Sequence, residues 1–240
     1  MEIDRNKTAE VVIVGGGVIG LSIARALALL GVRNVVVIER ARPGSEASSA
    51  AAGMLAPQAE ADGADDFFHL ACQSRDLYPR FAAALREETG IDIELDETGT
   101  LYVALTEEDE AEIERRYKWQ ARAGLAVEKL TAHEARMLEP CISAAVRSGL
   151  RFPLDVQVEN RRLVSALAES DERLGVQLIT STTVEAISIE HNAIKGVETS
   201  RGSVSTPCLV LAAGAWTSHL DHQFKRLPGL RIEPIRGQMV

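Results

Sequence analysis

The sequence predicts an α/β fold built on a parallel sheet, and three consecutive segments predict it. An uncharged, β-branched run occupies 11–14 and leads directly into glycines, a helical pattern of apolar residues occupies 18–30, and a second β-branched run occupies 35–38. Strands that are apolar throughout, without alternation, are typical of a parallel sheet buried on both faces. The three segments therefore form a strand–helix–strand unit, the repeating element of doubly wound α/β folds.

Each element of this unit has its own signal. In 18–30 the apolar residues recur at helical spacing, with Arg25 on the other face, and Gly31 supplies the residue that ends such a helix. The second strand closes at Glu39. The first unit is thus complete within about forty residues.

The middle of the chain has a different character. We expect a helix over 66–88, a strand over 100–105, and a charged helix that begins after Thr106 and continues to Arg122. Thr106 with Asp109, and Thr131 with Glu134, have the spacing of helix-capping boxes, and Pro140 stops the second helix. Short strands return at 176–180, 184–190, 194–199 and 208–213. This order predicts a nucleotide-binding domain interrupted by an inserted segment.

Composition excludes several classes of protein. The chain has 240 residues, 46% of them hydrophobic and 25% charged, which is typical of a folded globular protein. Its net charge of -9 disfavours binding to nucleic acid or anionic lipid. The uncharged stretch 11–24 is shorter than the roughly 20 residues of a membrane helix, so we expect no membrane association.

The three cysteines, Cys72, Cys141 and Cys208, are far apart and form no CxxC or Cys/His pattern. This arrangement argues against a disulfide framework and structural zinc, and it favours a reducing compartment, the cytoplasm. His219 and His222 are three residues apart, but without a nearby carboxylate or cysteine we expect no metal site. His69 and His133 lie in amphipathic helical patterns and are expected to be exposed.

The chemistry begins at Gly15, Gly17 and Gly20, which form GxGxxG between the first strand and the first helix. Gly15 permits a tight turn, Gly17 lets the backbone approach a pyrophosphate, and Gly20 lets helix and strand pack closely. The unpaired amides at the helix N-terminus favour a bound anion. Glu39, at the end of the second strand, is placed to accept hydrogen bonds from ribose hydroxyls. The unit therefore predicts an adenine-dinucleotide site.

Glycine-rich turns are common, and the motif gains its force from the order of strand, glycines, helix, strand and acid. Arg40 could favour NADP, but the carboxylate of Glu39 would repel a 2′-phosphate, which leaves FAD or NAD. The small residues of 45–60, with hydroxyls at Ser48 and Ser49, allow close approach to a cofactor, or alternatively form a helix packed on the sheet. The strand that ends at Ala213 and Gly214 could bring a second backbone segment to the cofactor, or simply end in a turn.

The segments VVIVGGGVIGLSIA, SSAAAGMLAPQAE, DVQVE, LVLAAGAWTS and EPIRGQ resemble consecutive landmarks of the D-amino-acid-oxidase-like flavoprotein family, and within it the glycine oxidase branch that serves thiamine biosynthesis. The resemblance extends from about Glu10 onward and implies a Rossmann-like FAD-binding domain with an interrupting α+β substrate domain that is incomplete at the C-terminus. We expect the FAD-binding domain at 1–88 and 147–221, and a partial substrate domain at 89–146 and 222–240.

The resemblance also implies which residues bind FAD. Those near the pyrophosphate, the ribityl chain, the flavin and the adenosine are, in chain order, Gly15, Gly17, Val18, Ile19, Gly20, Glu39, Arg40, Ala47, Ser48, Ala52, Gly53, Met54, Val184 and Gly214, with Ala213 a weaker candidate. Ala52, Gly53 and Met54 would lie against the flavin ring, and Val184 would flank the adenine through its main chain.

The implied reaction is flavin-dependent oxidation of a small amine such as glycine or sarcosine to an imine, with oxygen as electron acceptor and peroxide as product. In this family the tyrosine and arginine that hold the substrate follow the PIRGQ strand, and this sequence ends two residues after that motif, so it resembles about two-thirds of an oxidase and the catalytic residues stay unassigned. Arg231 and Arg236 match no family substrate residue.

Two alternatives remain open. One is a D-amino-acid dehydrogenase that passes electrons to a quinone or carrier, and the other is a non-catalytic FAD-binding fragment. The expected partners are a small amine and oxygen; the sequence is compatible with a homo-oligomer but does not indicate one.

Overall fold

The computed structural model describes residues 7–218, 232–235 and 237, and the chain forms two compact units. The first unit consists of Met1–Ala51, Leu85–Asp92 and Asn160–Val240, and the second of Ala52–Ala84 and Ile93–Glu159. The sequence had placed the insertion at 89–146, so the second unit begins earlier and ends later than expected. The reason is a short antiparallel pair, β3 (Met54–Leu55) with β7 (Val156–Gln157), which joins its two segments. That this unit binds the substrate stays a prediction.

The first unit contains the predicted parallel sheet, with strand order β12-β1-β2-β8. Its strands are β1 (Val11–Val14), β2 (Val35–Ile38), β8 (Gln177–Ile179) and β12 (Leu209–Leu211). Strands β1 and β2 have the predicted bounds and are buried at every position. Because all neighbouring pairs are parallel, the carboxyl ends of the strands share one edge of the sheet.

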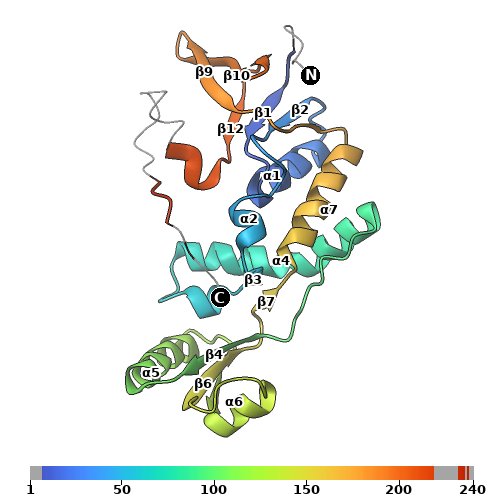
Figure 1. The fold of residues 1–240 in the computed structure, drawn as a ribbon. Coiled ribbons are helices and arrows are strands. Elements are labelled where there is room, and N and C mark those ends of the chain that lie inside the picture. The colour runs from blue at the N-terminus through green and yellow to red at the C-terminus, as the bar shows by residue number, and fades with distance from the viewer. Residues whose placement is uncertain (1–6, 219–231, 236, 238–240) are drawn as a thin grey trace. The chain divides into compact units, whose positions relative to one another are not determined.

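Two different layers cover the faces of this sheet (Figure 1). Val11, Ile13 and the alternate residues of β2 pack with Ala24 of α1 (Val18–Leu29) on one face. On the other face Val12 and Val14 pack against an antiparallel sheet of order β11-β10-β9. That sheet consists of β9 (Val184–Glu190), β10 (Ala193–Thr199) and β11 (Gly202–Ser205). The uniformly apolar strands are thus explained by burial on both faces.

Helix α7 (Asn160–Arg173) packs beside α1 and was not among the expected elements. Its apolar residues at 163, 164, 166 and 167 have helical spacing and are buried, so periodicity could have predicted it. The buried Arg25 of α1 donates from Nε to Ser170 of this helix (3.0 Å) and forms an ion pair with Glu88 (2.5 Å). The face of α1 that carries Arg25, opposite the apolar residues, is therefore buried by a polar cluster.

Asp171 lies next to this cluster and is completely buried. Within the part of the chain that the structure describes, neither of its carboxyl oxygens has a hydrogen-bond partner. Burial raises the pKa of Asp171 to about 8, although the positive charge of Arg25 acts in the opposite direction. Asp171 is therefore a carboxyl group that the fold keeps protonated at neutral pH.

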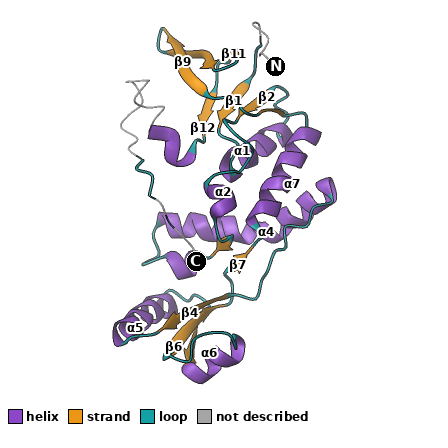
Figure 2. Cartoon of the chain, in the orientation of Figure 1, coloured by secondary structure: helices purple, strands orange, loops and turns teal. Residues whose placement is uncertain are grey.

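The second unit contains an antiparallel sheet of order β4-β6-β5 (Figure 2). Its strands are β4 (Thr100–Ala104), β5 (Glu128–Thr131) and β6 (Ser148–Phe152), and helices α3 (Pro57–Glu60), α5 (Glu107–Arg122) and α6 (Ala132–Leu138) accompany them. Ile113 of α5 packs with Leu150 and Phe152 of β6 to form its core. Helix α4 (Asp66–Thr89) contributes residues up to Ala84 to this unit and its last turn to the first.

Both predicted capping boxes are confirmed. The Thr106 hydroxyl accepts from Asp109 N–H, and the Asp109 carboxylate accepts from Thr106 N–H; Thr131 and Glu134 do the same at α6. Hydrogen bonds from the N–H groups of Leu105 and Thr106 hold the pKa of the Asp109 carboxyl below its usual value, and the bonds from Thr131 do the same for Glu134. His69 and His133 are exposed, as expected. Among the described helices, none has both the length and the apolar character to cross a bilayer.

Candidate functional site

The glycine turn lies at the carboxyl end of β1 and has the geometry that the motif requires. Gly15 has φ +109°, and a Cβ atom there would lie 2.4 Å from the carbonyl oxygen of Ala212. A Cβ on Gly20 would lie 1.9 Å from the Gly15 carbonyl oxygen. Only glycine fits at either position, so the turn, α1 and the end of β12 approach one another as closely as a dinucleotide-binding turn needs.

The N-terminus of α1 faces this turn. Gly17 is its N-cap residue and contributes no side chain, while the Val18 N–H donates to Ser48 Oγ (3.0 Å). Val18 is half-buried and Ile19 is exposed. Backbone amides and a serine hydroxyl at a helix N-terminus suit an anion, so this arrangement fits the diphosphate of a dinucleotide.

Glu39 is buried, at 8% exposure, and both of its carboxylate oxygens are oriented by the backbone. Oε2 accepts from Gly16 N–H (2.8 Å) and Oε1 from Ala41 N–H (2.8 Å). Each oxygen keeps a further acceptor position, which fits a ribose with free hydroxyls. Arg40 is exposed and forms an ion pair with Glu46 (2.5 Å).

The run of small residues 45–60 forms two single turns of helix, α2 (Ala47–Ala50) and α3 (Pro57–Glu60), with β3 between them. Asn160 of α7 fixes α2 by donating from Nδ2 to the Ser48 carbonyl oxygen (2.6 Å). Ala47 is exposed and Ser48 is half-buried. The alternative of a helix packed tightly on the sheet does not hold for α2, because none of its four residues is buried, and Ser48 lies beside the glycine turn.

Two other predicted residues belong to the same unit. Val184 begins β9 and its side chain is buried, so any contact with the cofactor would come from its main chain. Gly214 begins the 3₁₀ turn η1 (Gly214–Trp216) after β12 with φ +53°, and Ala213 precedes it. The first unit thus groups the glycine turn, Glu39 and Ser48 at the carboxyl edge of its sheet, while their contacts with FAD stay predictions.

Ala52, Gly53 and Met54 belong to the second unit. The Gly53 carbonyl accepts from Val158 N–H (3.0 Å), and Met54 pairs with Gln157 in β7. Ala52 and Met54 are exposed. This segment is therefore an ordered backbone edge with accessible residues, and its predicted place against the flavin stays a prediction.

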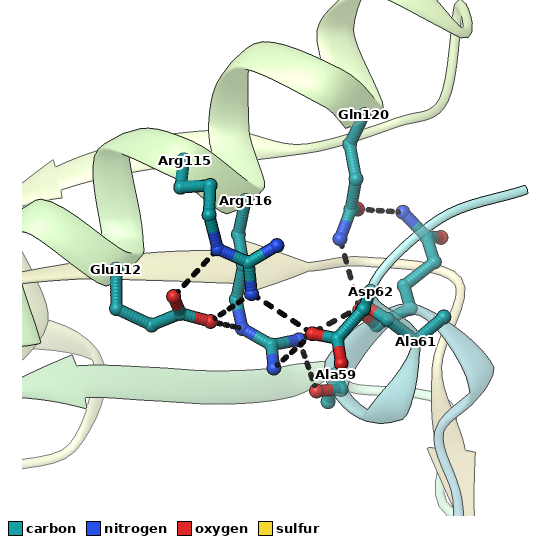
Figure 3. A network of polar contacts seen from close by, with 8 residues as sticks. Ala59, Ala61, Asp62, Glu112, Arg115, Arg116 and Gln120 are labelled. Carbon is teal, nitrogen blue, oxygen red and sulfur yellow. Dashed lines mark hydrogen bonds and ion pairs between the residues drawn. The ribbon is translucent and has the colours of Figure 1, made fainter.

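A buried polar network holds the segment that follows Met54 (Figure 3). Arg116 of α5 donates from Nη1 to the carbonyl oxygens of Ala59 (2.8 Å) and Ala61 (3.1 Å). Gln120 donates to the Gln58 carbonyl (2.9 Å), and its own amide oxygen accepts from Gln58 Nε2 (2.9 Å). Sequence reasoning missed this network because no motif marks a glutamine pair separated by 62 residues.

Asp155, which lies between β6 and β7, also holds the segment that follows Met54. It is fully buried and accepts from the N–H groups of Gln58 (3.3 Å) and Ala59 (3.0 Å) and from Arg75 Nη1 (3.3 Å). Burial nevertheless raises its pKa, because desolvation outweighs these hydrogen bonds. The residues that follow Met54 are thus fixed by side chains from α4, α5 and the 153–155 turn.

We expect Gln120→Ala to destabilise the second unit by about 2–3 kcal/mol, because the buried Gln58 loses the partner of its carbonyl oxygen and one of the two partners of its side-chain Nε2, which keeps only the Ala126 carbonyl. Chemical denaturation followed by circular dichroism measures the loss. Gln73→Ala is the matched control, because Gln73 is exposed on α4. Equal stability of the two variants would contradict the anchoring role.

Four residues considered in the sequence lie outside the described residues. These are His219, His222, Arg231 and Arg236. No substrate role was expected for the two arginines and no metal for the two histidines, and both expectations stay untested.

Comparisons with known proteins agree with this geometry. The family model described as FAD dependent oxidoreductase (DAO) matches residues 10–240. Glycine oxidase of Geobacillus kaustophilus is 38% identical over 96% of this chain and 60% of its own length. Its crystal structure matches with a TM-score of 0.87, covering 92% of this chain and 59% of that one.

Two further proteins match this chain, one in sequence and one in structure. The bifunctional protein ThiO/ThiG of Trichormus variabilis is 34% identical over 97% of this chain and 34% of its own length. L-proline dehydrogenase from P. horikoshii matches in structure with a TM-score of 0.80 at 25% identity, over 94% of this chain and 58% of that one. The chain therefore spans about 60% of the length of the glycine oxidase that it resembles. The match over residues 10–240, together with the dinucleotide-binding geometry of the first unit, shows that this chain belongs to the DAO family of FAD-dependent oxidoreductases.

Proposed function

We propose that the protein oxidises a small amino acid or amine, such as glycine or sarcosine. The carbon beside nitrogen loses a hydride and the nitrogen a proton, which gives an imine; water then hydrolyses the imine to an oxo acid and an amine, which is ammonia from glycine and methylamine from sarcosine. Oxygen takes up the two electrons and two protons and leaves as hydrogen peroxide. The observation that supports this substrate class is the 38% identity to a glycine oxidase over 96% of the chain.

FAD, when bound, supplies the two-electron acceptor for this reaction. The chain's own residues bind and orient: the α1 N-terminus and Ser48 suit the diphosphate, and Glu39 suits the adenosine ribose. The second unit offers the backbone of 52–54, held in place by β7 and the Val158 N–H, for the flavin ring. No residue of this chain is assigned to the substrate carboxylate, for which a bidentate arginine is the usual clamp.

A dehydrogenase is the second candidate, because the chain also matches an L-proline dehydrogenase in fold with a TM-score of 0.80. In that case a quinone or carrier, instead of oxygen, would accept the electrons. A third possibility is that the chain binds FAD without catalysis and depends on a partner chain.

The test is to reconstitute the protein with FAD and mix it with glycine and with sarcosine, first without oxygen and then in air. An oxidase bleaches the flavin absorption in the first step and produces peroxide steadily in the second. Bleaching without peroxide, but with reduction of an added quinone, would favour the dehydrogenase. Flavin binding without bleaching by any amino acid would favour the non-catalytic reading.

We further propose that the reaction serves thiamine biosynthesis in the cytoplasm. The 34% identity to a ThiO/ThiG protein supports the pathway, and the three free cysteines are compatible with a reducing compartment. Complementation of a thiamine-requiring strain that lacks its own glycine oxidase would test the pathway.

A further inference from the structure

Arg40 has two partners that the cofactor motif does not explain. Its guanidinium carbon lies 4.4 Å from the ring centroid of Trp216, and its Nη2 lies 2.5 Å from Glu46 Oε1. Both distances are within the range of a cation–π contact and an ion pair. The guanidinium is thus placed from one side by an aromatic face and from another by a carboxylate.

Hydrogen bonds fix the turn that carries Trp216. The backbone N–H of Trp216 donates to the Ala213 carbonyl (3.0 Å), and the buried Thr217 donates from Oγ1 to the Gly214 carbonyl (2.8 Å). Gly214 allows this turn because it adopts φ +53°. The indole, 37% exposed as a residue, is therefore presented by an ordered turn at the carboxyl end of β12.

The strand order shows where the Arg40–Trp216 contact lies. Arg40 follows β2 and Trp216 follows β12, and these strands flank β1 on opposite sides. Two strands separated by a third are about 10 Å apart, so the two side chains together reach across the carboxyl end of β1. The glycine turn that begins with Gly15 emerges at that end. The guanidinium therefore lies over the edge of the sheet where the dinucleotide's diphosphate is expected.

We propose that Trp216 positions Arg40 for the diphosphate of the cofactor and that Glu46 competes with the diphosphate for the same guanidinium. Stacking on the indole leaves the N–H edge of the guanidinium available for phosphate oxygens. The Glu46 carboxylate occupies part of that edge, so the diphosphate must displace it. Trp216 and Glu46 are thus positioning residues that act on the cofactor through Arg40, whichever amine the enzyme oxidises.

The experiment compares ADP with adenosine as ligands of the 240-residue protein, using isothermal titration calorimetry. Both carry the adenine and ribose, but only ADP carries the diphosphate. We expect Trp216→Ala to weaken ADP binding about threefold to tenfold, as for the loss of one cation–π contact, and to leave adenosine binding unchanged. Trp216→Phe keeps an aromatic face, so its affinity for ADP should lie between those of the wild type and Trp216→Ala. This variant also tests the proposal if the alanine variant does not fold.

Glu46→Gln should change the affinity for ADP in the opposite direction. Because it removes the competing charge, this variant should bind ADP more tightly than the wild type, again with unchanged adenosine binding. Glu190→Gln removes one exposed negative charge from β9 of the same unit and should change neither affinity. The proposal is overturned if Trp216→Ala weakens both ligands equally or neither, or if Glu46→Gln weakens ADP binding.

Discussion

Replacing Asp171 by asparagine is expected to stabilise the protein at alkaline pH, by on the order of 4 kcal/mol at pH 9. Asp171 is completely buried, none of the residues that the structure describes forms a hydrogen bond with its carboxyl oxygens, and its pKa is raised from 3.8 to about 8. The folded protein therefore holds a proton that the unfolded chain releases above pH 4. The contribution of this group to stability is complete below pH 4, declines as pH rises, and is lost by about pH 8.

Urea denaturation at several pH values between 4 and 9 measures this effect. The wild type should lose stability through this range with a slope that approaches 1.4 kcal/mol per pH unit from this one group, and Asp171→Asn should lack that slope. Glu172→Gln, at the neighbouring exposed position of α7, should keep it. Parallel curves for the wild type and Asp171→Asn would show that the carboxylate finds a partner, for which Arg25 is the nearest cation.

Gly20→Ala is expected to abolish FAD binding, with a loss of affinity of at least about a hundredfold. The added methyl group would lie 1.9 Å from the Gly15 carbonyl oxygen, a backbone atom that can move only if the glycine turn moves with it. Helix α1 must then separate from β1, and its N-terminal amides move away from the diphosphate. Equilibrium dialysis with FAD, or the flavin absorption of the purified protein, measures the loss.

Two controls separate the clash from the general effect of replacing a glycine. Gly63 has ordinary backbone angles and open space around its Cβ position, so Gly63→Ala should leave FAD binding unchanged. Gly31 has φ +91° and equally open space, so Gly31→Ala should cost about 1 kcal/mol of stability through strain, again without an effect on FAD. If Gly20→Ala bound FAD as the wild type does, the close approach of helix and turn would not be needed for the cofactor.

The first unit was predictable from sequence where the pattern is local. Strand 11–14, helix α1 and strand 35–38 follow from a continuous apolar pattern and three glycines, and the capping boxes at Thr106 and Thr131 need only four residues each. Glu39 was placed correctly because strand ends in a parallel sheet share one edge.

What escaped prediction depends on residues far apart in the chain. Asn160 holds Ser48 from 112 positions away, and Arg116 binds the Ala59 carbonyl from 57 positions away. Such contacts leave no periodicity, because each uses a single side chain whose partner is a backbone carbonyl. The bounds of the second compact unit differ from the predicted insertion, and its two segments meet in the two-residue pairing of β3 with β7, which leaves no pattern in the sequence.

The pairing of β1 with β12 also determines when the sheet can form during protein synthesis. Strand β12 follows β1 by about 200 residues, so at typical rates of synthesis it leaves the ribosome roughly 10–40 s later. During that interval β1 has β2 and α1 as neighbours, while one of its edges is unpaired and able to associate with other chains. The glycine turn also lacks the Ala212 carbonyl, against which Gly15 packs in the finished sheet. We therefore expect the nascent chain to acquire its cofactor site only after β12 has left the ribosome, and its sensitivity to aggregation to be greatest before that point.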